Sequence, residues 1–178
     1  DHILVLDADL SGSTKTAMVK KVRPNQHFNM GIAEANMMSV AAGMAAQGNV
    51  VFASSFAMFA TGRAYEQIRN SIAYPNLNVK ICASHAGITV GEDGASHQTI
   101  EDISLMRGIP NMVVMVPADA YAAREAIQCA YVHKGPCYVR LGRSAVETIY
   151  EKDQVPFTLG KGNVLRKGKH VAVVACGI

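Results

Sequence analysis

Short apolar runs rich in β-branched residues recur along the chain, at intervals that leave room for a helix between them. Each run is almost continuously apolar, which is typical of strands in a parallel sheet that is covered on both faces. The pattern predicts six strands, at residues 3–6, 50–53, 79–82, 112–116, 137–139 and 171–174.

Three longer segments between these runs carry helical patterns. Residues 33–46 are rich in Ala and Met and end at a Gln-Gly pair, and Gly is a common residue after a helix C-terminus. Residues 56–73 place apolar side chains at helical spacing before Pro75 ends the segment. Residues 119–132 begin with Asp119 as a candidate N-cap. This alternation predicts an α/β fold, with a mainly parallel sheet covered by helices on both faces.

Two segments depart from the alternation. Residues 84–100 form a polar, Gly-rich stretch, and a loop of that length in a compact domain is usually functional or disordered. Residues 141–170 are loop-like, and the predicted strand at 171–174 follows them. A strand so close to the last residue predicts a fragment, or a chain from which a further domain is missing.

Composition narrows the class of protein. Of the 178 residues, 49% are hydrophobic and 17% charged, which is ordinary for a soluble globular domain. No apolar run reaches about 18 residues, and the N-terminus lacks signal-peptide features, so we expect no membrane association. The net charge of +3 comes from scattered basic residues without interleaved aromatics, so we expect no nucleic-acid partner. Four cysteines in apolar stretches, without metal-ligand or redox spacing, predict buried free thiols and a cytoplasmic location: Cys82, Cys129, Cys137 and Cys176.

Two positions near predicted helix starts permit both a structural and a functional interpretation. Glu34 follows a Gly turn, where the helix dipole stabilises a carboxylate by roughly 0.3–1 kcal/mol. The small residues after it allow a close neighbour, which would bury Glu34 at an interface. Phe56 and Phe59 come directly after a predicted strand. Core packing would explain their spacing, and so would a flat platform for a heteroaromatic ligand.

The polar loop after the strand at 79–82 holds the densest group of reactive side chains. Between residues 84 and 98 it contains His85, His97, two carboxylates and three glycines. Open parallel sheets bind ligands at the carboxyl ends of their strands. The two histidines lie twelve residues apart with no tight pair, which disfavours a metal site. A surface loop with incidental histidines and a site for a small, oxygen-rich substrate both fit, and we favour the second.

Together these segments resemble, in order and spacing, the pyrimidine-binding domain of transketolases. The likeness covers roughly residues 3–145 and implies the thiamine-diphosphate-binding fold. Its most specific part is the run Gly-Glu-Asp-Gly-x-x-His-Gln, because Gly-x-x-Glu recurs in several thiamine diphosphate families. The matching segments are GIAE at 31–34, SFAMF at 55–59, GEDGASHQ at 91–98, DADLSGS at 7–13 and RLGR at 140–143.

The resemblance implies a cofactor site. Glu34 matches the catalytic carboxylate that hydrogen-bonds the pyrimidine ring of thiamine diphosphate. Phe56 and Phe59 match the pocket for that ring, and Asp9 matches a residue near the bound cofactor. Relatives often place a further aromatic residue or Arg next, whereas residues 62–63, Gly-Arg, follow here with a one-residue offset. The third wall of the pocket is therefore left open by the sequence.

The resemblance also implies a substrate site. Ser13, His85 and Arg143 match positions that hold a sugar phosphate, and a guanidinium suits paired phosphate oxygens. Asp93 matches a residue that contacts a substrate hydroxyl. His97 matches a second catalytic residue, which handles protons on the substrate oxygen or hydrogen-bonds it. No metal ligand is expected in this chain.

A partner is implied by what is missing. In the family, a separate domain holds the diphosphate and its Mg²⁺ or Ca²⁺ through a Gly-Asp-Gly motif followed by Asn, which this sequence lacks. The resemblance therefore implies a half-site that needs a diphosphate-binding subunit or domain, in a homodimer or heterotetramer. It also implies a pyrimidine-binding domain at residues 1–150, with a linker and the first strand of a truncated C-terminal domain at 151–178.

The implied reaction is transfer of a two-carbon ketol unit between sugar phosphates, as in the pentose phosphate pathway. A 1-deoxy-D-xylulose-5-phosphate synthase and the β subunit of a 2-oxoacid dehydrogenase share this domain, but His85 together with residues 91–94 favours a transketolase. A non-catalytic assembly or regulatory domain is the alternative of another class, although every matched position is retained. A plain nucleotide-binding domain would need a Gly-x-Gly-x-x-Gly turn after the first strand.

Overall fold

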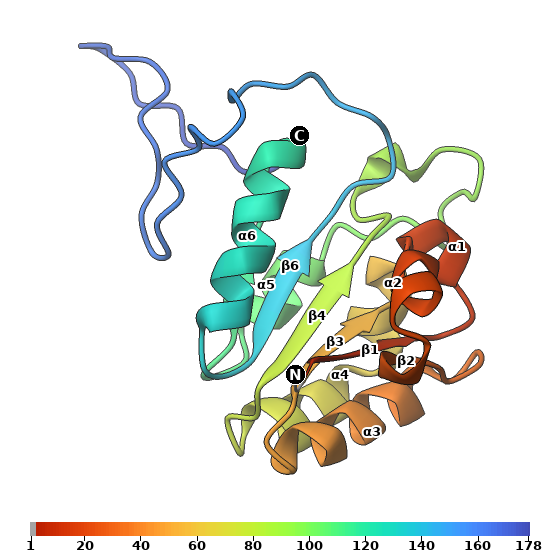
Figure 1. Cartoon of the computed structure of the whole chain (residues 1–178). Coiled ribbons are helices and arrows are strands. Elements are labelled where there is room, and N and C mark those ends of the chain that lie inside the picture. The colour runs from red at the N-terminus through yellow and green to blue at the C-terminus, as the bar shows by residue number, and fades with distance from the viewer. Residues whose placement is uncertain (1–2) are drawn as a thin grey trace.

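A six-stranded sheet forms the centre of the computed structural model, which describes residues 3–178 (Figure 1). The strand order is β2-β1-β3-β4-β6-β5, and every neighbouring pair is parallel. The strands are β1 (Ile3–Asp7), β2 (His27–Asn29), β3 (Val50–Ser54), β4 (Val79–Ala83), β5 (Val113–Met115) and β6 (Cys137–Arg140). The sheet therefore confirms five of the six runs predicted as strands.

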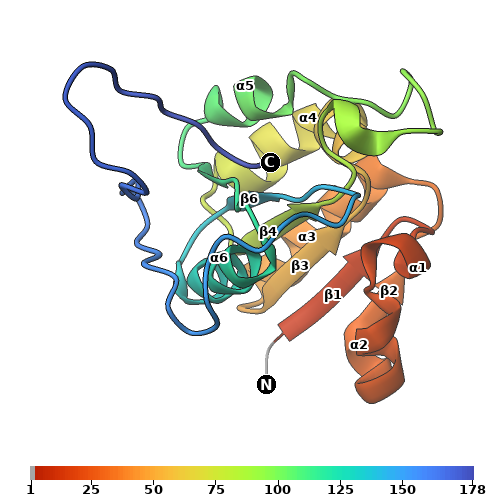
Figure 2. The ribbon, with the colours of Figure 1, turned by 90° about the horizontal axis from the view of Figure 1, so that it is seen from above.

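Helices cover both faces of the sheet, which confirms the predicted fold class (Figures 1 and 2). One face packs against α3 (Glu34–Ala46), α4 (Tyr65–Gln67) and α5 (Asp102–Arg107). The other face carries α6 (Ala120–Val132), with α1 (Ser11–Thr14) and α2 (Ala17–Val22) over its far side. Between α2 and α6 lies an apolar groove of about 740 Å³.

Successive side chains of each strand point to opposite faces of the sheet, and this explains why the strands are continuous apolar runs in the sequence. In β4, Ile81 packs into the core beneath α3, while the next residue, Cys82, packs beneath α6. In β6, Tyr138 and Val139 divide in the same way. Since both faces are buried, neither set of side chains can be polar without a partner.

The segment predicted as a single helix at 56–73 is more irregular than its pattern. A π-helical turn occupies Phe59–Arg63, α4 follows, and a second π-helical turn occupies Ile68–Ala73. A π turn closes over one more residue than an α turn, so it absorbs an extra residue without ending the helix. The position of the predicted helix is confirmed, and its regularity is corrected.

The strand predicted at 171–174 does not form, and residues 141–178 contain neither helix nor strand. Val171, Val173 and Val174 are each at least 80% exposed. A β-branched run becomes a strand only where another strand offers hydrogen bonds and a face to pack on, and no described strand adjoins this one. Residues 141–178 thus form an irregular C-terminal arm. Cys176 in this arm is exposed, which corrects the prediction that all four thiols are buried.

Candidate functional site

Four neighbouring strands, β1, β3, β4 and β6, end at one edge of the sheet. Pairing continues past the strand ends, because Phe56 forms a parallel bridge with Ser84 and the Leu141 N–H donates to the Ala83 carbonyl at 2.8 Å. This extension brings the loop at 84–100 beside the start of the helical segment at 59–73. Carboxyl ends of parallel strands are where such sheets bind ligands.

Glu34, the first residue of α3, is the buried carboxylate of this edge. It is 4% exposed, and Nη1 of Arg63 lies 3.3 Å from its Oε2 and 3.4 Å from its Oε1. The Arg63 guanidinium also covers Phe59, with Cζ 4.0 Å from the ring centroid. Arg63, which the sequence left unassigned, therefore forms a wall above Phe59 and beside Glu34.

Aromatic rings connect this carboxylate to the polar loop. Phe56 stacks on His85 with centroids 3.8 Å apart, and on Phe59 with centroids 6.1 Å apart. His97 meets Phe59 edge-on at 5.0 Å. The predicted pocket aromatics and both loop histidines thus form one cluster, and Phe56, at 7% exposure, belongs to the core as well.

His85 is held in one orientation. Its backbone is left-handed, with φ at 58°, and its Nδ1 lies 2.9 Å from Ser84 Oγ. Burial lowers the pKa of His85; Asp93 opposes this shift, and Arg143 and His97 add to it. Three other predicted substrate residues are therefore close enough to influence His85 electrostatically, and its imidazole is neutral at pH 7.

A buried polar network supports the loop from beneath. Asp102 Oδ2 accepts from Tyr138 OH at 2.6 Å and from Arg140 Nε at 2.7 Å. Burial raises the pKa of Tyr138 well above its ordinary value. Gly87, with φ at 82°, lies against Arg140, whose Nη2 would be 3.2 Å from an added Cβ. Sequence reasoning did not single out this network, because Asp102 is 36 residues from Tyr138 and 38 from Arg140 along the chain.

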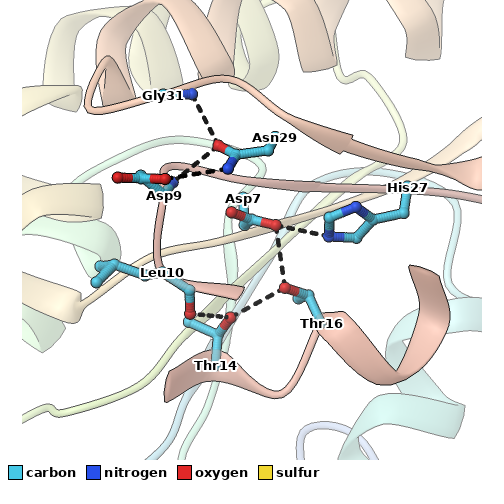
Figure 3. A network of polar contacts seen from close by, with 8 residues as sticks. All are labelled: Asp7, Asp9, Leu10, Thr14, Thr16, His27, Asn29 and Gly31. Carbon is cyan, nitrogen blue, oxygen red and sulfur yellow. Dashed lines mark hydrogen bonds and ion pairs between the residues drawn. The ribbon is translucent and has the colours of Figure 1, made fainter. Parts of the chain in front are cut away.

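Asp9 is tied to the turn that precedes Glu34 (Figure 3). Asn29 Oδ1 accepts the backbone N–H of Asp9 at 3.0 Å and that of Gly31 at 2.8 Å. Asn29 Nδ2 donates to Asp9 Oδ1 at 3.1 Å. These bonds hold the end of β1 against the turn, and Asp9 itself has φ at 62°.

A second pair lies deeper in the same corner (Figure 3). His27 Nε2 is 2.6 Å from Asp7 Oδ2, which also accepts from Thr16 Oγ1 at 3.1 Å. Both members are buried, and the pair joins β1 to β2 with α2 beside it. Sequence reasoning missed it, because no spacing signal relates residues twenty apart whose strands happen to pair.

The remaining predicted residues are exposed. Asp93 lies in the loop, Arg143 lies after β6, and Ser13 lies in α1 beyond the end of β1. Arg143 Nη1 would be 3.2 Å from a Cβ on Gly91, which places it against the loop. Within residues 3–178, no group of three or more His, Cys, Asp or Glu could hold a metal ion. The same residues include no helix long and apolar enough to cross a membrane.

Comparison with known proteins identifies the family. The model of the transketolase pyrimidine-binding domain matches residues 1–148, which include every strand of the sheet. The chain belongs to this family. The structure of a split-gene transketolase, described as an inactive β4 tetramer, superposes on this pyrimidine-binding domain with a TM-score of 0.88 at 56% identity, and covers 99% of this chain and 56% of that one.

Two curated relatives are transketolase subunits or sections. A putative transketolase C-terminal section from Methanocaldococcus jannaschii is 56% identical over 99% of this chain, and the match covers 56% of that protein. The 6-deoxy-6-sulfo-D-fructose transketolase subunit SqwH of a Clostridium species is 43% identical over 100% of this chain and 55% of its own. The chain thus spans about half the length of these relatives.

Proposed function

We propose that this chain supplies the pyrimidine-binding and substrate-binding half of a transketolase-type enzyme. In this proposal the enzyme transfers a two-carbon ketol unit between sugar phosphates, and residues 1–150 form the working domain. Residues 151–178 would then be a linker to a C-terminal domain. Family membership supports the use of thiamine diphosphate.

One observation carries the proposal. A buried carboxylate, Glu34, contacts a planar N–H donor, the Arg63 guanidinium, whose Cζ lies over the Phe59 ring. An aminopyrimidine is also planar and also bears N–H donors, so it matches both the carboxylate and the ring face. The residues present therefore fit the cofactor that the family implies. When bound, thiamine diphosphate would supply the carbon that takes up and releases the ketol unit.

The chain's own residues would hold and orient the reactants. Glu34 would accept a hydrogen bond from the aminopyrimidine, and Asp9 would lie close to the cofactor, fixed by Asn29. Neutral His85 would donate to a substrate oxygen, and Arg143 would bind its phosphate. His97, which lies on the edge of Phe59, would exchange protons with the substrate oxygen.

A partner would complete the site. This sequence has no Gly-Asp-Gly motif followed by Asn, so we propose that another subunit holds the diphosphate and its Mg²⁺ or Ca²⁺. The similar split-gene transketolase, an inactive β4 tetramer, supports such an arrangement, because that tetramer is inactive. A heterotetramer in the cytoplasm is the proposed working form.

Calorimetric titration of thiamine diphosphate with Mg²⁺ tests this proposal. We expect binding to a mixture of this chain with its diphosphate-binding partner, and much weaker binding to this chain alone. The Glu34→Ala variant should lower ketol transfer by the mixture at least about a hundredfold, because a group that exchanges protons or polarises the cofactor is lost. A mixture that binds no cofactor would favour a non-catalytic assembly domain instead.

A further inference from the structure

Arg63 contacts both of the groups that the cofactor ring needs. Its Nη1 lies within 3.4 Å of both Glu34 carboxylate oxygens, and its Cζ lies over Phe59, 4.0 Å from the ring centroid. Within residues 3–178, no other cation lies within 4.0 Å of that carboxylate. The buried carboxylate is thus paired with a cationic side chain from the neighbouring helical segment.

The exposure and the geometry of the Arg63–Glu34 contact both favour its dissociation. The Arg63 side chain is 53% exposed, whereas Glu34 is 4% exposed. A single nitrogen makes both bonds, and each is at the long end of the hydrogen-bond range. The Arg63 guanidinium is already half in water, so it regains full hydration when it moves outward. The free-energy cost of breaking the ion pair is therefore small for Arg63. Glu34 cannot follow, since α3 buries it.

The π-helical turn at Phe59–Arg63 brings the side chains of Phe59 and Arg63 together. The turn ends at Arg63, one turn beyond Phe59, and Gly62 lies between them. A Cβ on Gly62 would be 2.6 Å from Met58 Cε, so the end of the Met58 side chain packs against the turn at this point. Arg63 is the last residue of the turn, and its long side chain reaches from there to Glu34.

We propose that Arg63 is a displaceable occupant of the pyrimidine pocket. In this structure its side chain covers Glu34 and Phe59, and in the proposal it leaves both when the aminopyrimidine ring enters. This inference rests on the proposed function, because it assumes that the ring uses those two groups. The pyrimidine ring and the guanidinium exclude one another. Both would occupy the space over Phe59, and both would hydrogen-bond the Glu34 carboxylate.

Displacement lowers the apparent affinity for the cofactor. A ligand that binds only the open arrangement has its dissociation constant raised by the inverse of the open fraction. Removal of the Arg63 side chain opens the pocket and leaves Glu34 without its cation, and both changes favour the cofactor. We therefore expect Arg63→Ala to tighten cofactor binding about three- to tenfold.

The test titrates thiamine diphosphate with Mg²⁺ into this chain assembled with its diphosphate-binding partner. Wild type, Arg63→Ala, Arg63→Gln and Glu34→Gln are compared by calorimetry. Arg69→Ala is the matched control, because Arg69 lies on the same helical segment and, within the described residues, its side chain hydrogen-bonds only its neighbour Asn70, at 2.8 Å. Arg63→Gln retains a donor for Glu34 but no cation, and covers the case in which Arg63→Ala folds poorly.

The outcomes separate this inference from the proposed function. Tighter binding by both Arg63 variants, with Arg69→Ala unchanged, supports displacement. Unchanged or weaker binding by the Arg63 variants, with wild type binding normally, overturns it and makes Arg63 a fixed wall of the pocket. A wild-type assembly that binds nothing overturns the proposed function and this inference together. A crystal structure of the loaded assembly should show Arg63 away from Glu34.

Discussion

Glu34 is a carboxyl group that is buried at the start of a helix. A helix N-terminus favours a carboxylate, because the first backbone N–H groups point toward it. Arg63 supplies the opposite charge from a different part of the chain. In the sequence, neither residue alone requires a functional explanation. Only their contact, stacked on Phe59, makes the pair a candidate for ligand exchange.

His85 makes stability depend on pH. Burial holds the pKa of its folded-state imidazole below the value of about 6.5 expected in the unfolded chain. Its contribution to stability is therefore complete above that pH, and falls as the pH drops toward the folded-state pKa. We expect the free energy of unfolding to fall between pH 7 and pH 5, and His85→Gln to reduce that fall. Urea unfolding at each pH measures it.

Two other histidines define the control for this experiment. Burial also lowers the pKa of His133, so His133 should leave a residual pH dependence in the His85→Gln variant. His170 lies exposed in the C-terminal arm, and His170→Gln should behave as wild type. Identical pH dependence in wild type and His85→Gln would mean that His85 is solvated in solution.

At the scale of elements, the π-helical turn explains a feature that the sequence showed without a cause. The sequence interpretation placed residues 62–63 one position out of register with the family pattern. The π-helical turn at Phe59–Arg63 is a place where one extra residue would fit without ending the helical segment. Such turns are common at functional sites, because they redirect side chains within a continuous helix.

Asp119 joins two elements, and its removal should cost more than a simple N-cap. Its Oδ1 accepts from the Ala122 N–H at 2.8 Å, and its Oδ2 accepts from the Ile149 and Tyr150 N–H groups at 2.9 and 3.0 Å. We expect Asp119→Ala to lower the free energy of unfolding by about 1–2 kcal/mol, measured in urea at pH 7. Asp119→Asn should lie between, because its amide keeps one acceptor.

The same carboxylate gives the Asp119 effect a pH limit. Burial would raise its pKa, but the backbone N–H groups of Ala122, Tyr150, Ile149 and Tyr121 lower it below its ordinary value. Its stabilisation is thus complete above about pH 4 and is lost as the pH falls through the folded-state pKa. Equal stabilities of wild type and Asp119→Ala at pH 7 would contradict the cap and the tether alike.

At the scale of the whole molecule, the sheet and its two helical layers carry the fold, and the arm after β6 adds little. Residues 151–178 make no sheet pairing, and their best anchor is Phe157, partly buried against the core beneath α6. Arg124 and Asp153 form an exposed pair at 3.5 Å, which contributes little. The arm runs outside the layers, as Figure 1 shows.

Truncation after residue 150 should therefore leave a folded domain. We expect chain 1–150 to keep the circular dichroism of its helices, and to lose less than about 2 kcal/mol of unfolding free energy from the partial burial of Phe157. The Asp119 contacts to Ile149 and Tyr150 remain in this chain. Collapse of the shortened chain into an unfolded state would show that the arm is part of the domain.

The sequence by itself determined the strands and helices that local pattern controls. A strand buried on two faces must be apolar throughout, and a helix N-cap must have an acceptor, so β3, β4 and the start of α6 were predictable. The run at 171–174 met the same local criterion and still failed. Pairing needs a neighbouring strand, and local pattern carries no information about neighbours.

Tertiary structure alone decided which polar side chains meet. Glu34 and Arg63 are 29 residues apart, and Asp102 and Arg140 are 38 apart. Their contacts depend on the order of the strands, the crossings between them and a π-helical turn, none of which is encoded at a fixed spacing. The sequence therefore indicated the candidate residues of the site, and the tertiary structure determined which of them pair. Pairing matters because a buried charged group without a partner is energetically costly.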